Sequence, residues 1–248
     1  MDEKTCDWRA RIGIMTPACC PNQVCEWWGN LPDGVTFHEA IMGMVENNPE
    51  GLLALREKAM VEGKKLADGL MDILLFACTS GSFIGGPGYD QRIIKELEEA
   101  TGIQSTTTST CVLTAFTDMG IKKMAMLGPY IPEVIDKEIE FFKANGIETV
   151  YAKGLGYRAN LDFTRLHFQP YLFYPLAQEA YRQAPDVDCI FITCMASPSR
   201  KVINPLEKET GKIVMSSQSA ALYGVLKQLG IKEEIPDYGK LGKLLATI

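Results

Sequence analysis

The sequence predicts an α/β protein made of two related lobes, each with a parallel sheet covered by helices. Short apolar segments alternate with helical patterns of about 10–15 residues, and this rhythm is typical of parallel strands joined by crossover helices. Three motifs also recur in the same order, at offsets of 116, 112 and 109 residues. The repeated segments are 72–78 with 188–194, 11–17 with 123–129, and 101–102 with 210–211.

In the first half of the chain, apolar spacing and glycine positions locate the elements. Leu52, Leu55 and Ala59 recur at helical spacing, and Gly69 follows the end of that pattern. Gly102 and Gly120 follow two later helical patterns in the same way. Strands are predicted over 12–15, 72–77 and 103–107, and helices over 52–67, 91–100 and 112–119.

The second half repeats the alternation. Pro132 opens a helix whose buried stripe is expected to be Ile135, Ile139 and Phe142, and 145–146 (Asn-Gly) closes it. Proline in the first turn and glycine beyond the last is the usual asymmetry of helices. Strands are predicted over 123–127, 149–152, 189–193 and 213–216, and helices over 132–144, 172–182, 202–210 and 220–229.

The composition narrows the function classes. The 248 residues are 46% hydrophobic and 23% charged, with 25 Lys and Arg against 31 Asp and Glu, so we expect a globular acidic protein without nucleic-acid or membrane partners. No apolar run approaches the roughly 20 residues that a membrane helix needs, and residues 1–7 carry no apolar signal core. We therefore expect a cytoplasmic protein whose eight cysteines are thiols. Two histidines are too few for a three-histidine metal site.

Two cysteines stand at equivalent places in the repeat. Cys78 ends a predicted strand and opens a small, glycine-rich loop, and Cys194 does the same in the second half. The carboxyl ends of parallel strands are where α/β folds bind ligands. We assign residues 1–116 plus 217–248 to the first lobe and 117–216 to the second, so one thiol from each lobe would flank a small substrate and act as nucleophile or acid/base. A buried structural cysteine is the alternative interpretation of each one.

Other residues leave alternatives open. Cys19, Cys20 and Cys25 are poorly spaced for a zinc site, so no metal is expected, although Cys19 or Cys20 could line the pocket. The pair 27–28 (Trp-Trp) fits a pocket wall, a core pair or a dimer contact equally well. Arg158, Arg165 and Arg200 are interpreted as structural or solvated rather than as substrate ligands, and His38 and His167 as structural.

A set of ordered motifs covers nearly the whole chain. It comprises Ile12-Gly13-Ile14-Met15-Thr16-Pro17, Cys78-Thr79-Ser80-Gly81-Ser82-Phe83, Gly128-Pro129-Tyr130, Gly154-Leu155-Gly156 with Asn160, Thr193-Cys194, Pro205-Leu206-Glu207 and Gly211-Lys212-Ile213-Val214-Met215-Ser216-Ser217. This set resembles the aspartate/glutamate racemase superfamily, in the branch of maleate cis-trans isomerases and arylmalonate decarboxylase. The resemblance implies two pseudo-symmetric flavodoxin-like lobes with parallel four-stranded sheets, an active site in the interlobe cleft, no cofactor, and a homodimer or higher homo-oligomer.

The resemblance also implies a mechanism. In isomerase-like members the first cysteine adds to the alkene of a small carboxylic acid and the second handles the proton, so Cys78 would be the nucleophile and Cys194 the acid/base. The alternatives are an amino-acid or hydantoin-type racemase that moves a proton between two thiols, an arylmalonate decarboxylase-like enzyme, and a non-enzymatic small-acid binding protein. Residues expected to bind the substrate are Thr79, Ser80, Tyr130, Met195, Ala196, Pro17, Cys20 and Asn160.

The chain departs from the family pattern at two places. Cys20 stands where isomerase-like members usually place an asparagine that holds a carboxylate, and Asn22 is the nearest residue that could replace it. Gln218 follows Ser217 where the family often has asparagine. Both changes put maleate itself in question as the substrate, whereas the two-thiol chemistry is unaffected. Decarboxylase-like members have glycine at the position of Cys78, so the chain is more similar to the isomerases or racemases.

Overall fold

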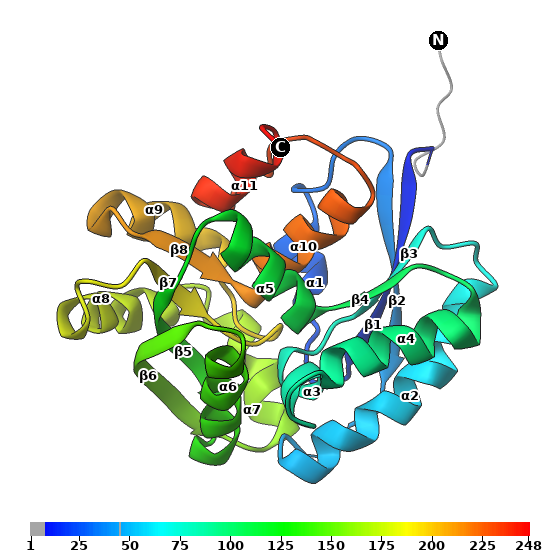
Figure 1. The fold of residues 1–248 in the computed structure, drawn as a ribbon, viewed down its shortest axis with the longest axis horizontal. Coiled ribbons are helices and arrows are strands. Elements are labelled where there is room, and N and C mark those ends of the chain that lie inside the picture. Colours follow the sequence, from blue (N-terminus) through cyan, green and yellow to red (C-terminus); the bar gives the residue numbers. More distant parts are fainter. Residues whose placement is uncertain (1–7, 45) are drawn as a thin grey trace.

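A computed structural model describes residues 8–44 and 46–248, and these form two sheets side by side (Figure 1). Residues 1–7, where the sequence shows no signal core, lie outside the described residues. The first sheet has the order β2-β1-β3-β4 and the second has the order β6-β5-β7-β8, with every pairing parallel. The strands are β1 (Ala10–Pro17), β2 (Val35–Met42), β3 (Ile73–Phe76), β4 (Ser105–Thr107), β5 (Lys123–Tyr130), β6 (Glu148–Tyr157), β7 (Cys189–Ile192) and β8 (Ile213–Ser216). The predicted fold class is confirmed.

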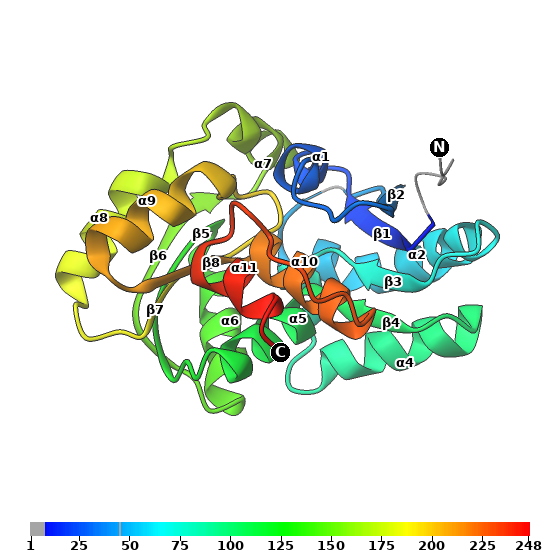
Figure 2. The ribbon, with the colours of Figure 1, turned by 90° about the horizontal axis from the view of Figure 1, so that it is seen from above.

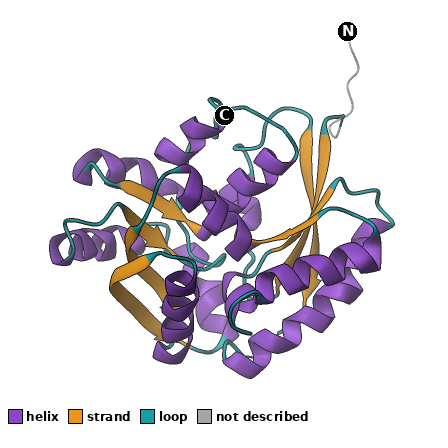
Figure 3. Ribbon diagram, viewed as in Figure 1, coloured by secondary structure: helices purple, strands orange, loops and turns teal. Residues whose placement is uncertain are grey.

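Helices cover both sheets, as Figure 3 shows in purple around the orange strands. In the first lobe α2 packs on β1, β2 and β3, and α4 packs on α2 and β4. In the second lobe α6 and α8 pack on β5 and β6, and α9 packs on β8. The helices are α1 (Gln23–Trp27), α2 (Pro49–Ala67), α3 (Thr79–Phe83), α4 (Tyr89–Thr101), α5 (Thr108–Asp118), α6 (Pro132–Ala144), α7 (Asn160–Arg165), α8 (Phe173–Gln183), α9 (Arg200–Thr210), α10 (Ser217–Gln228) and α11 (Gly239–Leu245), with a 3₁₀ turn η1 over Leu166–Phe168.

The two lobes end their central strands in the same way. The peptide N–H of Ala77, just after β3, donates to the carbonyl of Met15 in β1 at 3.0 Å. At the equivalent place the N–H of Thr193, just after β7, donates to the carbonyl of Leu127 in β5 at 2.8 Å. The next residue in each lobe is the cysteine that the sequence repeat singled out. The repeat therefore brings each cysteine to the carboxyl edge of its sheet.

A helix follows the last strand of each sheet in the same way: α5 comes after β4, and α10 comes after β8. They pack against each other at the centre of the molecule (Figures 1 and 2). Residues 217–226 of α10 are all buried, so this helix has no solvent face along that length. A Cβ atom on Gly224 would lie 2.6 Å from the Cys111 sulfur of α5 and 3.1 Å from its Cα, which makes glycine necessary for this close approach.

Several elements differ from the expectations. The sequence around His38 is typical of either a surface strand or a loop, and the structure makes it the strand β2. Its sequence carries His38 and Glu39, and only its two end residues are buried. It is an edge strand, and such strands lack the apolar run of a central one. The short helices α1, α3, α7 and α11 were not predicted. The helical stripe of α6 is shifted, since Val134, Ile135, Glu138, Phe141 and Phe142 are buried while Ile139 is partly exposed.

Among the described residues no helix is long and apolar enough to cross a membrane.

The α5–α10 contact generates a test of stability. Gly→Ala substitution inside an exposed helix usually stabilises by up to about 1 kcal/mol, but Gly224→Ala should destabilise the protein by about 1–3 kcal/mol because the methyl group overlaps Cys111. Thermal unfolding of this variant, with Lys208→Ala at an exposed position of α9 as a control, measures the difference. A Gly224→Ala protein that melts at or above the wild-type temperature would contradict the described contact.

Candidate active site

Cys78 is held at the junction of β3 and α3. Its backbone is extended and it is the N-cap of α3, with its sulfur accepting the Gly81 N–H at 3.3 Å. A Cβ atom on Gly81 would lie 2.9 Å from that sulfur, so the tight turn needs glycine. The thiol is only 6% exposed. Burial raises the pKa of Cys78 to about 12, against the opposing effect of the Gly81 amide, so the loop amide does not make this buried thiol a thiolate at neutral pH.

Cys194 occupies the matching place after β7, in a strained conformation. Its φ is +82°, a region that residues with a side chain rarely adopt and that costs about 1–3 kcal/mol. The Ala196 N–H donates to its sulfur at 3.3 Å, and the Ser197 hydroxyl donates to the Thr193 carbonyl at 2.7 Å. The thiol is 4% exposed. Strain of this kind persists only where the surroundings fix it, and it is common at catalytic sites.

The two thiols share one electrostatic environment with Tyr130. Negative charge on Cys194 raises the pKa of Cys78, although burial is the larger cause. Burial raises the pKa of Tyr130 well above its usual value, and charges on Cys194, Glu138 and Cys78 add to that effect. The pKa of one buried phenol thus depends on charge at both thiols, one from each lobe.

Two further cysteines complete a sulfur cluster. The Cys19 and Cys20 sulfurs are 3.7 Å apart, and the Asn47 side-chain amide donates to Cys19 at 3.5 Å. Hydrogen bonding from Cys20 lowers the pKa of Cys19, and the pKa of Cys20 is raised because its thiol hydrogen-bonds to Cys19 and Cys194. The ionisation of Cys20 is therefore linked to Cys194, one of the two predicted catalytic thiols. Asn47, which the sequence analysis did not single out, supports this cluster.

The other predicted site residues are placed as follows. The Thr79 hydroxyl donates to the Ser217 hydroxyl at 2.9 Å, and the Ser80 hydroxyl lies 3.8 Å from the Cys78 sulfur. Ser80 also opposes the rise in the Tyr130 pKa, which places its hydroxyl beside the phenol. The Pro17 carbonyl accepts the Cys20 N–H at 2.9 Å.

The remaining predicted residues are already engaged in hydrogen bonds. The Ala196 amide points at the Cys194 sulfur, and the Met195 carbonyl accepts the side-chain amide of Gln218. The Asn160 amide donates to the Met44 carbonyl, and its oxygen accepts from Asn47 at 3.5 Å. Asn160 thus connects α7 to the segment around Asn47.

Several polar atoms in this region are buried without a hydrogen-bond partner among the described residues. They include the Tyr130 hydroxyl, both polar atoms of Asn22 and of Gln23, and Oε1 of Gln218. Each buried unpaired group costs about 1–3 kcal/mol. Asn22 precedes α1, yet its side-chain oxygen does not cap that helix, a role in which asparagine is favoured. A polar ligand would satisfy such groups, and the sequence alone could not show which of them lack partners.

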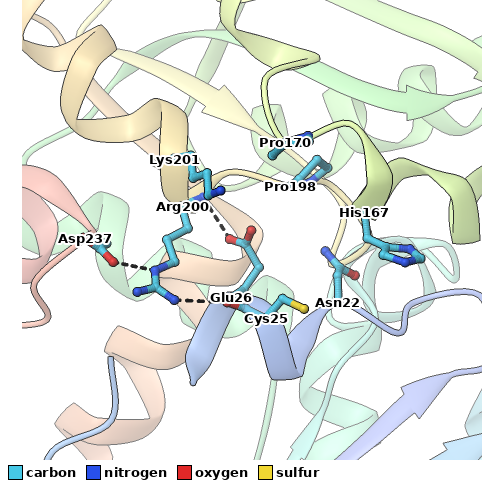
Figure 4. A pocket seen from close by; sticks show the side chains of 9 residues that line it. All are labelled: Asn22, Cys25, Glu26, His167, Pro170, Pro198, Arg200, Lys201 and Asp237. Atoms are coloured by element: carbon cyan, nitrogen blue, oxygen red, sulfur yellow. Dashed lines mark hydrogen bonds and ion pairs between the residues drawn. The ribbon is translucent and has the colours of Figure 1, made fainter. Parts of the chain in front are cut away.

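A pocket of about 460 Å³ lies beside this cluster (Figure 4). It is framed by ion pairs and hydrogen bonds within the protein: Arg200 pairs with Asp237, and Glu26 accepts from the Ser199 and Arg200 backbone amides at 3.1 and 3.0 Å. Arg200 also donates to the Cys25 and Trp28 carbonyls, so its guanidinium is engaged within the protein while it lines the pocket. Neither Cys78 nor Cys194 is among the lining residues, which are Asn22, Cys25, Glu26, His167, Pro170, Pro198, Arg200, Lys201 and Asp237.

The structure also places the two adjacent tryptophans and the two histidines. Trp27 is buried and makes an edge contact with Phe37 at 5.9 Å between ring centroids, whereas Trp28 is 71% exposed. His38 lies on β2 and contacts Thr36 at 3.1 Å, while His167 lines the pocket of Figure 4. Within the described ranges, no group of three His, Cys, Asp or Glu side chains is arranged to hold a metal ion.

Known proteins match this chain over most of its length. The maleate isomerase of Geobacillus stearothermophilus is 25% identical over 245 residues, which cover 93% of this chain and 96% of that protein. The arylmalonate decarboxylase of Bordetella bronchiseptica is 25% identical over 234 residues, covering 93% and 95%. A solved structure of a Nocardia farcinica maleate cis-trans isomerase mutant with a covalently bound succinylcysteine intermediate has a TM-score of 0.85 at 22% identity, covering 94% of this chain and 98% of that one.

The family model gives the same assignment. The model described as arylmalonate decarboxylase matches residues 12–242, nearly the whole of the described α/β structure. The resemblance seen in the Cys78 and Cys194 motifs is thereby confirmed. The chain belongs to the arylmalonate decarboxylase family.

Proposed function

We propose that this protein is a cofactor-independent isomerase that converts a small cis-unsaturated dicarboxylic acid, with maleate as the reference substrate, to its trans form. The observation that carries the proposal is the matched placement of Cys78 and Cys194, each buried just after the central strand of its sheet. The buried hydroxyl of Tyr130, which has no hydrogen-bond partner among the described residues, responds to charge on both thiols. Relatives named maleate isomerase match most of the chain, and one similar structure contains a succinylcysteine, the adduct expected when a thiol adds to maleate. A cysteine at both positions also favours this chemistry over decarboxylation.

The reaction can be written with these groups and solvent. The reaction begins when Cys78 releases its proton to solvent, which its raised pKa makes infrequent at neutral pH. The Cys78 thiolate then forms a carbon–sulfur bond at one alkene carbon, and the π electrons move to the neighbouring carbon and its carboxylate. The Tyr130 hydroxyl stabilises the enediolate oxygen by donating a hydrogen bond, and Cys194 delivers its proton to the carbon. The central bond is now single and rotates. Cys194 then removes a proton, the double bond re-forms, and the carbon–sulfur bond breaks to release the trans acid and the Cys78 thiolate.

Replacing the two thiols tests their roles. Cys78→Ser should abolish conversion of maleate to fumarate because serine is a far weaker nucleophile at neutral pH. Cys194→Ser should lower turnover by about 10²–10⁴-fold through loss of the proton donor. Proton NMR in D₂O follows fumarate formation and would also reveal racemisation or decarboxylation of a panel of small acids.

The matched control is Cys189→Ala, because Cys189 is buried at the opposite end of β7 from Cys194. This variant should keep wild-type turnover if only Cys78 and Cys194 react. Full activity in Cys78→Ser or Cys194→Ser would remove the role assigned to that residue. A wild-type protein that leaves maleate unchanged but exchanges the α-proton of another acid would replace the isomerase proposal by a racemase.

Tyr130 allows activity and stability to be separated. Because its hydroxyl has no partner among the described residues, Tyr130→Phe should leave the melting temperature unchanged or raise it. The same change should lower kcat/KM by about 10²–10³-fold, since an oxyanion donor is lost. Tyr223→Phe is the comparison, because that hydroxyl donates to Asp118 at 2.7 Å and should affect stability and not turnover. Equal activity of Tyr130→Phe and wild type would exclude Tyr130 from the reaction.

The raised pKa of Cys78 predicts a pH dependence. With a pKa of about 12, the thiolate fraction of Cys78 should increase about tenfold per pH unit throughout the range from 7 to 10. Mass spectrometry of peptides alkylated by iodoacetamide measures the rate at Cys78 separately from the other cysteines. The rate constant should rise with that slope and without a plateau. A plateau below pH 9 would show that the thiol is ionised far more readily than its burial indicates.

A further inference from the structure

Glu138 is a buried carboxyl group to which the proposed chemistry gives no role. It lies in the middle of the buried face of α6, which packs against β5, β6 and α3, and it is 0% exposed. Carboxyl groups are almost never fully buried unless paired. Among the described residues, no cation is paired with this carboxyl group. Burial raises its pKa, and the hydrogen bond from the Thr193 hydroxyl opposes that rise.

The contacts of Glu138 lead directly to Cys194. Its Oε1 accepts a hydrogen bond from the hydroxyl of Thr193, the residue immediately before Cys194, while its Oε2 has no partner among the described residues. Thr193 is also confined from the other side, since a Cβ atom on Gly128 would lie 2.3 Å from its methyl group. The hydroxyl of Thr193 is therefore aimed at one acceptor, and that acceptor is Glu138.

Glu138 also acts on the phenol of the site. Tyr130, at the end of β5, is the titratable group whose pKa responds to the charge of Glu138. No ionisable group of α3 or β6 contributes to the ionisation of Glu138 itself. A charge on this carboxyl would thus be felt where the substrate carboxylate is proposed to bind, with little solvent to screen it.

We propose that Glu138 is a positioning residue that anchors Thr193 and the strained Cys194 after it, and that it must be uncharged for a dicarboxylate to bind beside Tyr130. The second part rests on the proposed function. The first part depends only on the fold, since a residue with φ of +82° needs an external anchor.

The charge state follows from burial. Burial raises the pKa of Glu138 to about 8, so the folded protein carries it protonated at neutral pH and ionises it under mildly alkaline conditions. An ionised Glu138 would repel the two negative charges of the substrate. Binding should therefore weaken above about pH 8, by up to tenfold per pH unit.

The binding experiment uses succinate, a saturated dicarboxylate that a thiol cannot attack. Isothermal titration from pH 6.5 to 9.5 should show the wild-type Kd rising above about pH 8, and Glu138→Gln should keep its neutral Kd within about threefold and lose that rise. Glutamine retains an oxygen for Thr193 and cannot ionise. Glu140→Gln, an exposed position on α6, is the control and should behave as wild type. Superimposable pH profiles of wild type and Glu138→Gln would overturn the electrostatic role.

Two further measurements test the anchoring role of Glu138 separately from its electrostatic role. Glu138→Ala and Thr193→Val should each lower kcat at neutral pH at least tenfold with a smaller change in KM, and each should speed alkylation of Cys194, whereas Glu138→Gln should not. Unchanged Cys194 alkylation in both variants would overturn the anchoring role without reference to any substrate. If succinate fails to bind wild type at any pH, the dicarboxylate proposal and the electrostatic role both fall, while the alkylation result still decides the anchor.

Stability gives an independent check on the buried proton. The unfolded chain releases the Glu138 proton near pH 4.5 and the folded chain near pH 8, so wild-type stability should fall as pH rises between these values. Glu138→Gln lacks this dependence, and the difference in melting temperature should shift in its favour from pH 5 to pH 8. A constant difference across that range would show that Glu138 ionises in the folded protein as it does in water.

Discussion

The arrangement of the site depends on how the central strands of the two sheets end, β1 and β3 in one lobe and β5 and β7 in the other. Each central strand pair ends with the same hydrogen bond, from Ala77 to Met15 in one lobe and from Thr193 to Leu127 in the other. The chain must leave the sheet immediately afterwards, and the residue that does so is a cysteine in both lobes. Parallel pairing thus determines where the sulfurs lie before any side-chain contact is considered.

Burial then determines the protonation state of the Cys78 thiol. Removing a thiol from water favours its neutral form, and in Cys78 this effect exceeds that of the amide that points at the sulfur. Within the described part of the chain, the same burial leaves the Tyr130 hydroxyl and the Asn22 amide without hydrogen-bond partners. Buried polar groups without hydrogen bonds lower the stability of the ligand-free protein. A polar acid of suitable size would stabilise the folded state by hydrogen-bonding to them.

Much of the fold was predictable from sequence, because apolar periodicity and the repeat identify buried central strands and long helices. The edge strand β2 could not be told from a surface loop, since half-exposed strands lack a continuous apolar run. Cys78 and Cys194 could be found from their matching positions in the repeat. The cluster of Cys19 and Cys20 beside Cys194, and the position of Asn47, depend on contacts between distant segments that no local pattern contains. The unpaired amides of Asn22 and Gln23 are likewise invisible without coordinates.

The buried position of Glu138 was not predicted, although the sequence contains a signal for it. The expected stripe of α6 followed its isoleucines and placed Ile139 inside, whereas the buried positions 134, 135, 138, 141 and 142 are spaced by one helical turn with Glu138 at their centre. A glutamate inside such a stripe is a detectable signal, because a helix that packs on both a sheet and a neighbouring helix buries a wider face than the apolar residues alone suggest.

The wholly buried stretch of α10 has a consequence for how the molecule folds. Although the sheets are separate, their apolar residues form one continuous core that includes Leu222 and Val225 of this helix. Neither half can close its interior without the other, so a chain divided near residue 116 would leave both fragments with an uncovered apolar surface. The two lobes therefore form one cooperative unit. Because they share a core, they are expected to unfold together in a single thermal transition.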